Sequence, residues 1–348
     1  MQNQKIKFRA KIGAFLKKRA RVFILTAVFG AGALLGWYFR VFFVKASLPE
    51  VLRIGIKNNT YKFIDPLLGY DIPANGNASE FKIFENKIND LVDRLKLEGK
   101  VSDVGFYFRG LKSGYWLGVN EEEKFSPGSL MKVPLMMAYL KKAEIDPKLL
   151  SKQLVYDGKL DANQAEIFKA QAAIEPGKSY GVDELIRYMI VYSDNNAANT
   201  LLANVDQNSF GEVFADLGVD LPDLSKGDVD FMTPKQYALF LRTLRNSTYL
   251  NDEYSEKALE LLASASFPQG LAAGLPTDAT LAHKFGEYLF TAQNGSQTAE
   301  LHDCGYVYIP KSNYFICVMT KGRNYNDLAE SIKQLSSLTY QQVVNNFK

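Results

Sequence analysis

Three strand-like runs near the C-terminal end of the chain determine its predicted fold: LAHKFGEY at residues 281–288, LHDCGYVYI at 301–309 and YFICVMT at 314–320. Aromatic and β-branched residues recur in them, as is typical of strands. Two more strand-like runs lie far upstream, at 101–109 and 115–119, and the chain between 129 and 265 carries mainly helical patterns. Strands at both ends of a helical insertion predict an α+β domain with an antiparallel sheet built from sequence-distant segments.

Helical patterns also border the strands. Apolar residues recur at helical spacing before the first strand, at Phe84, Ile88 and Leu95, and after the last, at Leu328, Ile332 and Leu335. We therefore expect N- and C-terminal helices to flank the sheet and the middle of the chain to form an all-helical subdomain.

The two cysteines, Cys304 and Cys317, lie on a hairpin that turns at residues 310–313. A turn centred there places Cys304 opposite residue 319 and Cys317 opposite residue 306, so the two side chains are diagonal neighbours. This placement permits a disulfide in an oxidising compartment but does not favour one. We expect two buried small residues without a bond between them.

The N-terminal segment indicates a membrane anchor. Residues 22–39 contain no charge and the apolar run resumes after Arg40 as far as Val44, which is long enough for a helix to cross a bilayer. Basic residues before it predict a cytoplasmic N-terminus. We predict a cytoplasmic basic segment at 1–21, a single transmembrane anchor at 22–44, a juxtamembrane linker at 45–79 and an extracytoplasmic catalytic domain at 80–348, located at the cell membrane. The alternative is a cleaved signal peptide, although the run ends in bulky residues, Trp37-Tyr38-Phe39, and not in small ones.

The charge of the folded part excludes one class of partner. Ten of the 41 Lys and Arg residues lie within residues 1–45, where there is no acid, which leaves 31 basic against 38 acidic residues in the remainder. A domain with this negative balance is not expected to bind nucleic acid. We expect contact with the lipid bilayer through the N-terminal helix, and a monomer.

Three short motifs occur in one order along the chain: Ser129-Leu130-Met131-Lys132, Ser193-Asp194-Asn195 and Lys284-Phe285-Gly286. Each is weak by itself, and Ser79 with Lys82 repeats the first by chance. The ordered set with domain-sized separation indicates serine acyl transfer in which lysine moves the proton.

The first motif supplies the candidate nucleophile and base. Ser129 follows a Pro-Gly turn and opens an apolar helical run, where the free backbone N–H groups of a helix start favour negative charge. Lys132 lies one turn further on the same face, among apolar residues that lower the pKa of an ammonium. The alternative is a helix cap followed by a solvated lysine.

The second and third motifs supply the substrate contacts. Ser193 is a candidate proton relay and Asn195 a candidate partner of the acyl side chain, although Ser193 or Asp194 can equally be a helix cap. Lys284 is a candidate partner of a substrate carboxylate, the alternative being an ordinary edge-strand lysine. Gly286 marks a close backbone approach, by a substrate in our interpretation, and the backbone N–H near Glu287 would complete an oxyanion hole with that of Ser129.

Other chemistries find little support in the sequence. Only two histidines exist, His283 and His302, and neither lies at metal-ligand spacing from a partner or near a Gly-x-Ser-x-Gly elbow. We interpret both as structural and expect neither a metal nor a cofactor.

From about residue 80 to its end, the chain resembles the class A β-lactamases and penicillin-binding proteins, which share the set Ser-x-x-Lys, Ser-Asp-Asn and Lys-x-Gly. The resemblance implies that Ser129 is acylated, that Lys132 and Ser193 carry protons, and that Asn195 and Lys284 orient the substrate, beside Phe285, Gly286 and Glu287.

The chain departs from this family at two places. True β-lactamases have a Glu-x-x-Leu-Asn loop between the second and third motifs, whose Glu activates the deacylating water. The corresponding stretch, residues 218–228, lacks it and has only three Asp candidates, Asp220, Asp223 and Asp228. Phe285 stands where the family usually has Thr or Ser.

These features predict a membrane-anchored serine hydrolase that acts on β-lactams and deacylates slowly. The alternatives are a D-Ala-D-Ala carboxypeptidase of the penicillin-binding type, a catalytically inactive wall-binding module, and an esterase or amidase with another extracytoplasmic substrate.

Overall fold

The structure is a computed structural model that describes residues 54–55, 61–65, 67–68, 79–111, 114–222, 229–292, 294–310 and 312–346. The chain divides into a unit over residues 1–52 and a unit over residues 53–348, and the second contains the described residues. The predicted basic segment and anchor lie outside them. Within the described residues, no helix combines the length and the apolar character needed to cross a membrane.

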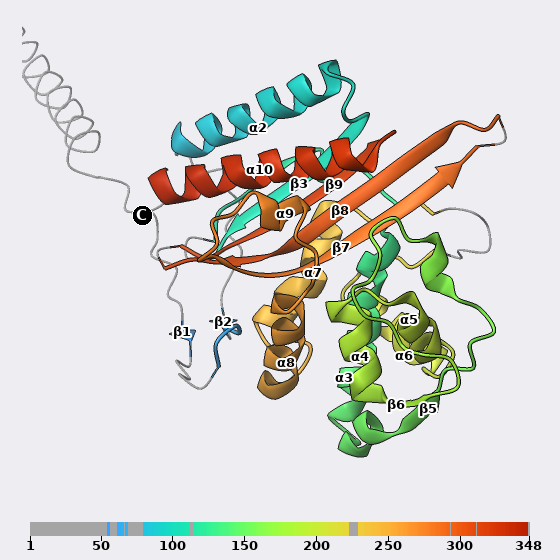
Figure 1. Ribbon diagram of the computed structural model, residues 1–348. Helices are drawn as coiled ribbons and strands as arrows, with labels where there is room; N and C mark the ends of the chain where they lie inside the picture. The colour runs from blue at the N-terminus through green and yellow to red at the C-terminus, as the bar shows by residue number, and fades with distance from the viewer. Residues whose placement is uncertain are drawn as a thin grey trace, which may run out of the picture. The chain divides into compact units, whose positions relative to one another are not determined.

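A five-stranded antiparallel sheet forms the centre of this unit, as predicted (Figure 1). In spatial order its strands are β4 (Trp116–Val119), β3 (Asp103–Gly110), β9 (Tyr314–Gly322), β8 (Gln297–Tyr308) and β7 (Thr280–Thr291). Strand β3 pairs with β9 along its whole length, from Asp103 opposite Lys321 to Gly110 opposite Tyr314. The sheet therefore joins the two ends of the domain around the inserted segment.

Helices α2 (Ser79–Leu97), α9 (Gly270–Ala273) and α10 (Tyr325–Asn346) cover one face of the sheet (Figure 1). The side chains predicted to face the sheet from the last helix, Leu328, Ile332 and Leu335, are all fully buried. Phe84 and Ile88 of α2 are fully buried as well. The prediction of flanking terminal helices is confirmed.

The inserted segment lies on the other face. It comprises η1 (Gly128–Met131), α3 (Lys132–Ala143), η2 (Pro147–Ser151), β5 (Gln153–Val155), η3 (Ala162–Ala165), β6 (Ser179–Gly181), α4 (Val182–Val191), α5 (Asn195–Leu202), α6 (Gln207–Asp216), α7 (Pro234–Arg245) and α8 (Asp252–Ala263). Helix α7 packs on β3, β8 and β9, and α8 packs on β7. A short pair of strands, β1 (Ile54–Gly55) and β2 (Leu67–Leu68), precedes α2.

The expectation of an all-helical subdomain is wrong in one detail. Strands β5 and β6 form an antiparallel pair inside it, with Leu154 opposite Tyr180. Each strand has three residues, and so short a run carries no alternation that distinguishes it from a loop.

The expectation for the cysteines is also wrong, because Cys304 and Cys317 form a disulfide. They lie directly opposite each other in the β8–β9 ladder, in which Val307 pairs with Tyr314. The turn is therefore centred one residue earlier than its composition indicates, and a one-residue shift of a hairpin turn moves every cross-strand partner by two positions.

Candidate active site

The candidate nucleophile, Ser129, lies in η1, a short 3₁₀ helix, and α3 begins three residues later at Lys132. Ser129 is half-buried and makes no side-chain cap at the start of either helix. Two β8 side chains hold Ser126, three residues before Ser129: Ser126 N–H donates to Glu300 Oε2 at 3.0 Å, and His302 Nε2 contacts Ser126 O at 2.8 Å. The turn is thus fixed to the sheet directly ahead of Ser129.

Two glycines let this turn touch strand β7. Gly128 has φ +50°, and a Cβ atom there would lie 2.3 Å from Glu287 O. A Cβ atom on Gly286 would lie 2.5 Å from Pro127 O, well inside van der Waals contact. Gly286 does mark a close backbone approach, but the approaching chain is the nucleophile turn of the protein itself. The prediction that named a substrate as the approaching group is therefore corrected.

Lys132 lies at the centre of a polar cluster. Its side chain is buried, with 5% of the residue exposed, and Nζ donates to Asn195 Oδ1 at 2.6 Å, to Ser193 Oγ at 3.1 Å and to Ser193 O. Burial lowers the pKa of Lys132 to about 8, against the opposing charges of Glu166, Asp194 and Glu287. A substantial fraction of this amine is therefore neutral near physiological pH.

Ser193 joins the two lysines. Its Oγ accepts from Lys132 Nζ at 3.1 Å and from Lys284 Nζ at 2.8 Å. The residue is buried and has φ +60°, a conformation that non-glycine residues rarely adopt. Asp194 caps α5 through Asn196 N–H and Ala197 N–H, so the capping interpretation holds for Asp194 while Ser193 faces the lysines.

Lys284 is fully buried, which separates it from an ordinary edge-strand lysine. Besides Ser193 Oγ, its ammonium donates to Phe285 O at 2.9 Å. Burial, together with the positive charge of Lys132, lowers the pKa of Lys284 well below its ordinary value. A substrate carboxylate beside it would favour the charged form.

The segment that contains η3 bonds to the second motif. Asn195 N–H donates to Asn163 Oδ1 at 2.8 Å, and Asn163 Nδ2 donates to Asp194 Oδ1 at 2.9 Å. Ala162 N–H donates to Asn196 Oδ1 at 2.8 Å. We call residues 161–168 the bridge segment. Its first part bonds to the second motif, and its last two residues bond to strand β7, which carries the third motif.

The side chain of Glu287 makes that second attachment. Its Oε1 accepts from Ile167 N–H at 2.7 Å and its Oε2 accepts from Phe168 N–H at 3.2 Å. The prediction for Glu287 concerned only its backbone N–H, so this role of its carboxylate was missed.

Phe285 packs into an aromatic cluster. Its ring stacks on Phe267, with centroids 4.0 Å apart and planes at 12°, and Phe168 of the bridge segment contacts both rings edge-on. Lys284 Nζ lies 4.2 Å from the Phe285 ring centroid. A cavity of about 270 Å³ adjoins Phe285 and Phe168 and extends to Tyr192, the neighbour of Ser193. The aromatic residue at this position thus supports the far end of the bridge segment.

Glu166, between the two attachments, is the functional candidate that sequence reasoning missed. It is 8% exposed, and its Oε2 has no hydrogen-bond partner among the described residues. Burial raises its pKa to about 7, against the attraction of Lys132, and the charge of Glu287 acts in the same direction as burial. An isolated Glu in a loop carries no periodic signal, so only the fold reveals its proximity to both lysines.

The structure offers less for the other candidates. Asp220 is exposed, and Asp223 and Asp228 lie outside the described residues. His283 Nδ1 contacts Asp303 Oδ1 at 2.7 Å, and His302 holds the nucleophile turn, so both histidines have structural contacts. No group of three or more His, Cys, Asp or Glu side chains arranged to hold a metal occurs in the part of the chain that the structure describes.

Comparisons with known proteins bear on the family and the fold of the chain. The model of the beta-lactamase enzyme family matches residues 83–343. A structure of PBP-A in a single-site variant, an acyl-enzyme complex with penicillin G, is 25% identical, with a TM-score of 0.62 over 78% of this chain and 97% of that chain. A β-lactamase from Chitinophaga pinensis is 20% identical (TM-score 0.62, 74% and 98% covered), and the TLA-3 extended-spectrum β-lactamase is 18% identical (TM-score 0.64, 76% and 99% covered). A search among curated proteins gives no match.

Proposed function

Because the chain belongs to the β-lactamase enzyme family and is a class A β-lactamase-like serine hydrolase, we propose that it acts on β-lactams through a covalent acyl-enzyme on Ser129. The observation that carries the proposal is the hydrogen-bond chain from Lys132 through Ser193 Oγ to Lys284. It unites one polar side chain from each motif in a buried cluster beside the turn that bears Ser129. A purely structural domain has no need of two buried lysines, each of which costs desolvation energy.

Acylation follows from the protonation states of this cluster. The neutral amine of Lys132 takes the proton of Ser129 Oγ as that oxygen forms its bond to the lactam carbonyl carbon. The carbon–nitrogen bond of the lactam then breaks, and the departing nitrogen takes a proton delivered through Ser193. The backbone N–H groups of Ser129 and Glu287 are the proposed donors to the oxyanion.

Substrate orientation rests on the two remaining motif residues. A substrate carboxylate would stabilise the charged form of Lys284, because its negative charge offsets the cost of burying the ammonium. Asn195 Oδ1 accepts from Lys132, and within the described part of the chain Asn195 Nδ2 makes a single long contact of 3.4 Å, to Ala162 O. Its amide group is therefore the proposed donor to the acyl side chain.

Deacylation is proposed to be slow, because the family's loop Glu has no counterpart between the second and third motifs. Glu166 is one of the carboxylates whose charge acts on both lysines, and it lies in the bridge segment, ahead of the second motif. With a pKa of about 7, Glu166 is only partly ionised near neutral pH. We propose that its ionised form accepts a proton from the water that attacks the ester carbonyl carbon. The bond from that carbon to Ser129 Oγ then breaks, and this oxygen takes the proton back from the Glu166 carboxyl, which leaves the acid product and the free enzyme.

The proposed location is the outer side of the cell membrane, with the monomeric catalytic domain held by the helix at residues 22–44. Support comes from the uncharged run at 22–39 and from the ten basic residues in the first 45.

A D-Ala-D-Ala peptide of the cell wall is the second candidate substrate. The likeness to PBP-A and the departure at Phe285 favour it, and the same acyl-enzyme steps apply with an amine as the leaving group. An inactive wall-binding module retains less support, since it needs none of the buried lysines. An esterase or amidase acting on a different acyl group would use the same nucleophile.

The test compares turnover of a chromogenic cephalosporin, a D-Ala-D-Ala peptide and a simple ester by the full chain and by Ser129→Ala. The proposal predicts a burst of about one equivalent of opened cephalosporin followed by slow turnover, and neither in the variant. Rapid steady turnover of cephalosporin would refute slow deacylation. Turnover of the peptide or the ester alone would reassign the substrate, and no reaction in any arm would favour the binding module.

A further inference from the structure

The cavity beside the catalytic cluster, which we call the Phe285 cavity, has a volume of about 270 Å³. A protein cavity of about 150 Å³ is enough to bind benzene, so this one has room for an aromatic ring and further atoms. Six of its ten lining residues are aromatic or apolar: Ile167, Phe168, Tyr192, Phe267, Pro268 and Phe285. The cavity can therefore hold one ring of a bound substrate.

The walls of the Phe285 cavity place it on the leaving-group side of the proposed substrate. Tyr192 precedes Ser193, the proposed proton donor to the leaving group, and Phe285 follows Lys284, the proposed partner of the substrate carboxylate. Lys284 Nζ lies 2.8 Å from Ser193 Oγ and 4.2 Å from the centroid of the Phe285 ring. Asn195, the proposed contact of the acyl side chain, does not line the cavity. A group released beside Ser193 therefore has this cavity next to it.

Three aromatic rings form a fixed wall of the cavity. Phe267 and Phe285 stack with centroids 4.0 Å apart, and 3% and 6% of these residues are exposed. Phe168 meets both rings edge-on, and its backbone N–H donates to Glu287 Oε2 at 3.2 Å. Because these rings are already ordered, an aromatic group can pack against them without reorganising the wall.

The Phe285 cavity carries little charge. Of the ten described residues that line it, one is charged: Lys169, whose Nζ donates to the backbone carbonyls of Asn163 and Gln164. Two exposed lining residues, Gln171 and Gln269, add neutral amide groups. A leaving group with a neutral ring thus matches the cavity better than one with a second charge.

We propose that the Phe285 cavity receives an aromatic side chain on the leaving group of the substrate and so sets specificity on that side. The inference rests on the acyl-enzyme chemistry proposed above. In acylation by an ester, Ser129 Oγ bonds to the carbonyl carbon and the bond from that carbon to the leaving oxygen breaks. This oxygen takes, through Ser193, the proton that Lys132 accepted from Ser129. The leaving group of a D-Ala-D-Ala peptide has only a methyl side chain and would leave the cavity unfilled.

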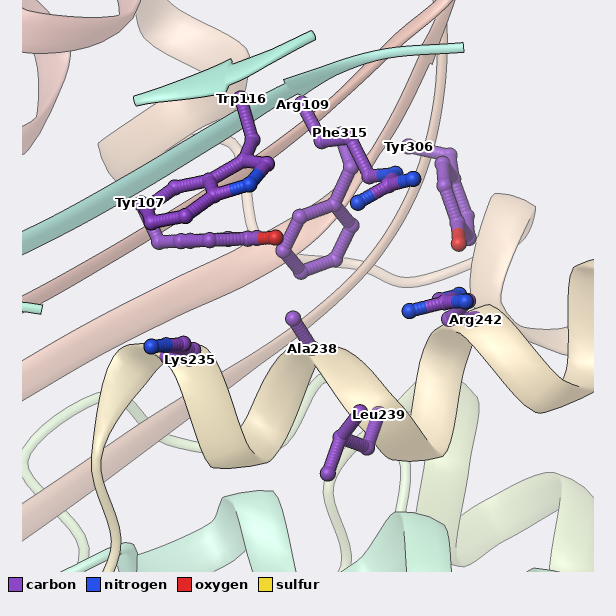
Figure 2. A pocket seen from close by; sticks show the side chains of 9 residues that line it. All are labelled: Tyr107, Arg109, Trp116, Lys235, Ala238, Leu239, Arg242, Tyr306 and Phe315. Atoms are coloured by element: carbon purple, nitrogen blue, oxygen red, sulfur yellow. The ribbon is translucent and has the colours of Figure 1, made fainter. Parts of the chain in front are cut away.

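A second cavity of the same protein provides a control. It lies between α7 and the sheet, has a volume of about 200 Å³, and counts Tyr107, Trp116 and Phe315 among its lining residues (Figure 2). None of its lining residues belongs to the three motifs, the bridge segment or the Phe285 cavity. A change to an aromatic residue there should leave the leaving-group preference intact.

The test uses two esters of phenylacetylglycine, one with lactate and one with 3-phenyllactate, each in both enantiomers. The two esters share the acyl group and the carboxylate meant for Lys284, and they differ by one phenyl ring. Acylation of the full chain in detergent is followed by intact-mass spectrometry, with Ser129→Ala as the blank. We expect the second-order rate constant for acylation to be at least about tenfold higher for one enantiomer of the phenyllactate ester than for the matching lactate ester.

Two variants reduce the space in the Phe285 cavity. Ser266→Leu should bring the ratio of the two rate constants to about one, and Ser266 Oγ makes no hydrogen bond within the described residues that this change could break. Gln269→Tyr, at an exposed lining position without a side-chain cap bond to α9, should lower the ratio at least about threefold. Trp116→Leu, in the second cavity, should keep the wild-type ratio. Thermal unfolding of each variant shows which are folded, and where Ser266→Leu is not, Gln269→Tyr decides.

A ratio near one in wild type would overturn the proposal, and so would a high ratio that persists in the folded cavity variants. An equal fall in Trp116→Leu would also count against it. If neither ester forms an adduct, acylation by esters has failed, and saturation-transfer NMR then tests the cavity alone by comparing free 3-phenyllactate with lactate. Binding of 3-phenyllactate that is lost in the folded cavity variants would uphold the inference, and the absence of binding, or binding unchanged in those variants, would refute it.

Discussion

Glu287 Oε1 accepts a hydrogen bond of 2.7 Å from the backbone N–H of Ile167, which lies 120 residues earlier in the chain. Asn163 of the same bridge segment bonds to Asp194 and Asn195 in the second motif. The bridge segment is therefore attached to both motif-bearing walls of the site. Glu166 lies between the attachments, with its carboxylate buried near the two lysines.

Glu287→Ala should loosen the bridge segment. Loss of the carboxylate leaves the N–H groups of Ile167 and Phe168 without these acceptors, and a lost hydrogen bond of about 1 kcal/mol corresponds to about fivefold faster amide exchange. Hydrogen exchange followed by mass spectrometry reports on these two amides. Glu122→Ala, which removes an exposed carboxylate bound to Lys235, is the control and should leave them unchanged. Equal exchange in wild type and Glu287→Ala would contradict the attachment.

Glu166→Gln should prolong the life of the acyl-enzyme. In wild type, the rate of adduct loss should rise with pH through about 7, because the ionised carboxylate is the active base. The variant should lack this rise and lose its adduct at least about 10²-fold more slowly above neutral pH. Mass spectrometry of the decaying adduct at several pH values measures both effects. Asp220→Asn, at an exposed acid of the stretch at residues 218–228, is the control. Matching decay in wild type and Glu166→Gln would remove Glu166 from the mechanism.

Lys132→Met should lower the rate of acylation by at least about 10²-fold. For wild type, acylation should increase as pH rises through about 8, since Lys132 must lose its proton to act as a base. Single-turnover acylation by benzylpenicillin across this range gives the profile. Lys141→Met changes an exposed lysine of the same helix and should react like wild type. A profile that stays flat through pH 8 would argue for a different base.

Phe285→Thr restores the residue type usual in the family, yet it should not speed acylation. The Phe285 ring packs on Phe267, so its loss should cost about 3 kcal/mol in the free energy of unfolding. Chemical denaturation measures this cost, and Phe290→Thr, on the same strand with 49% of Phe290 exposed, should be nearly neutral. A variant that acylates faster at unchanged stability would show that Phe285 obstructs the substrate and does not support the bridge segment.

The sequence predicts those parts of the fold that carry a strong local pattern. The strands are found because aromatic and β-branched residues recur in them, and the flanking helices because their apolar residues repeat at helical spacing. The family resemblance rests on three motifs in order. The disulfide was missed because a turn displaced by one residue changes every cross-strand partner. The β5–β6 pair was missed because its strands are too short to show a period.

The bridge segment could not be predicted for a different physical reason. Its attachments join residues up to 120 positions apart, and they consist of a few hydrogen bonds in which at least one partner is a side chain. Neither local propensity nor periodicity encodes such contacts. Glu166 and the carboxylate of Glu287 become candidates only once the fold brings them to the lysines.

The central claim, that Ser129 carries the acyl group, is tested most directly by intact-mass spectrometry of the full chain mixed with benzylpenicillin, with Ser129→Ala alongside and peptide mapping of any adduct. The account predicts an adduct of the mass of the intact drug, located on Ser129, present in wild type and absent from the variant. An adduct on another residue, an equal adduct in Ser129→Ala, or opened or unopened drug without any adduct at the earliest times would contradict it.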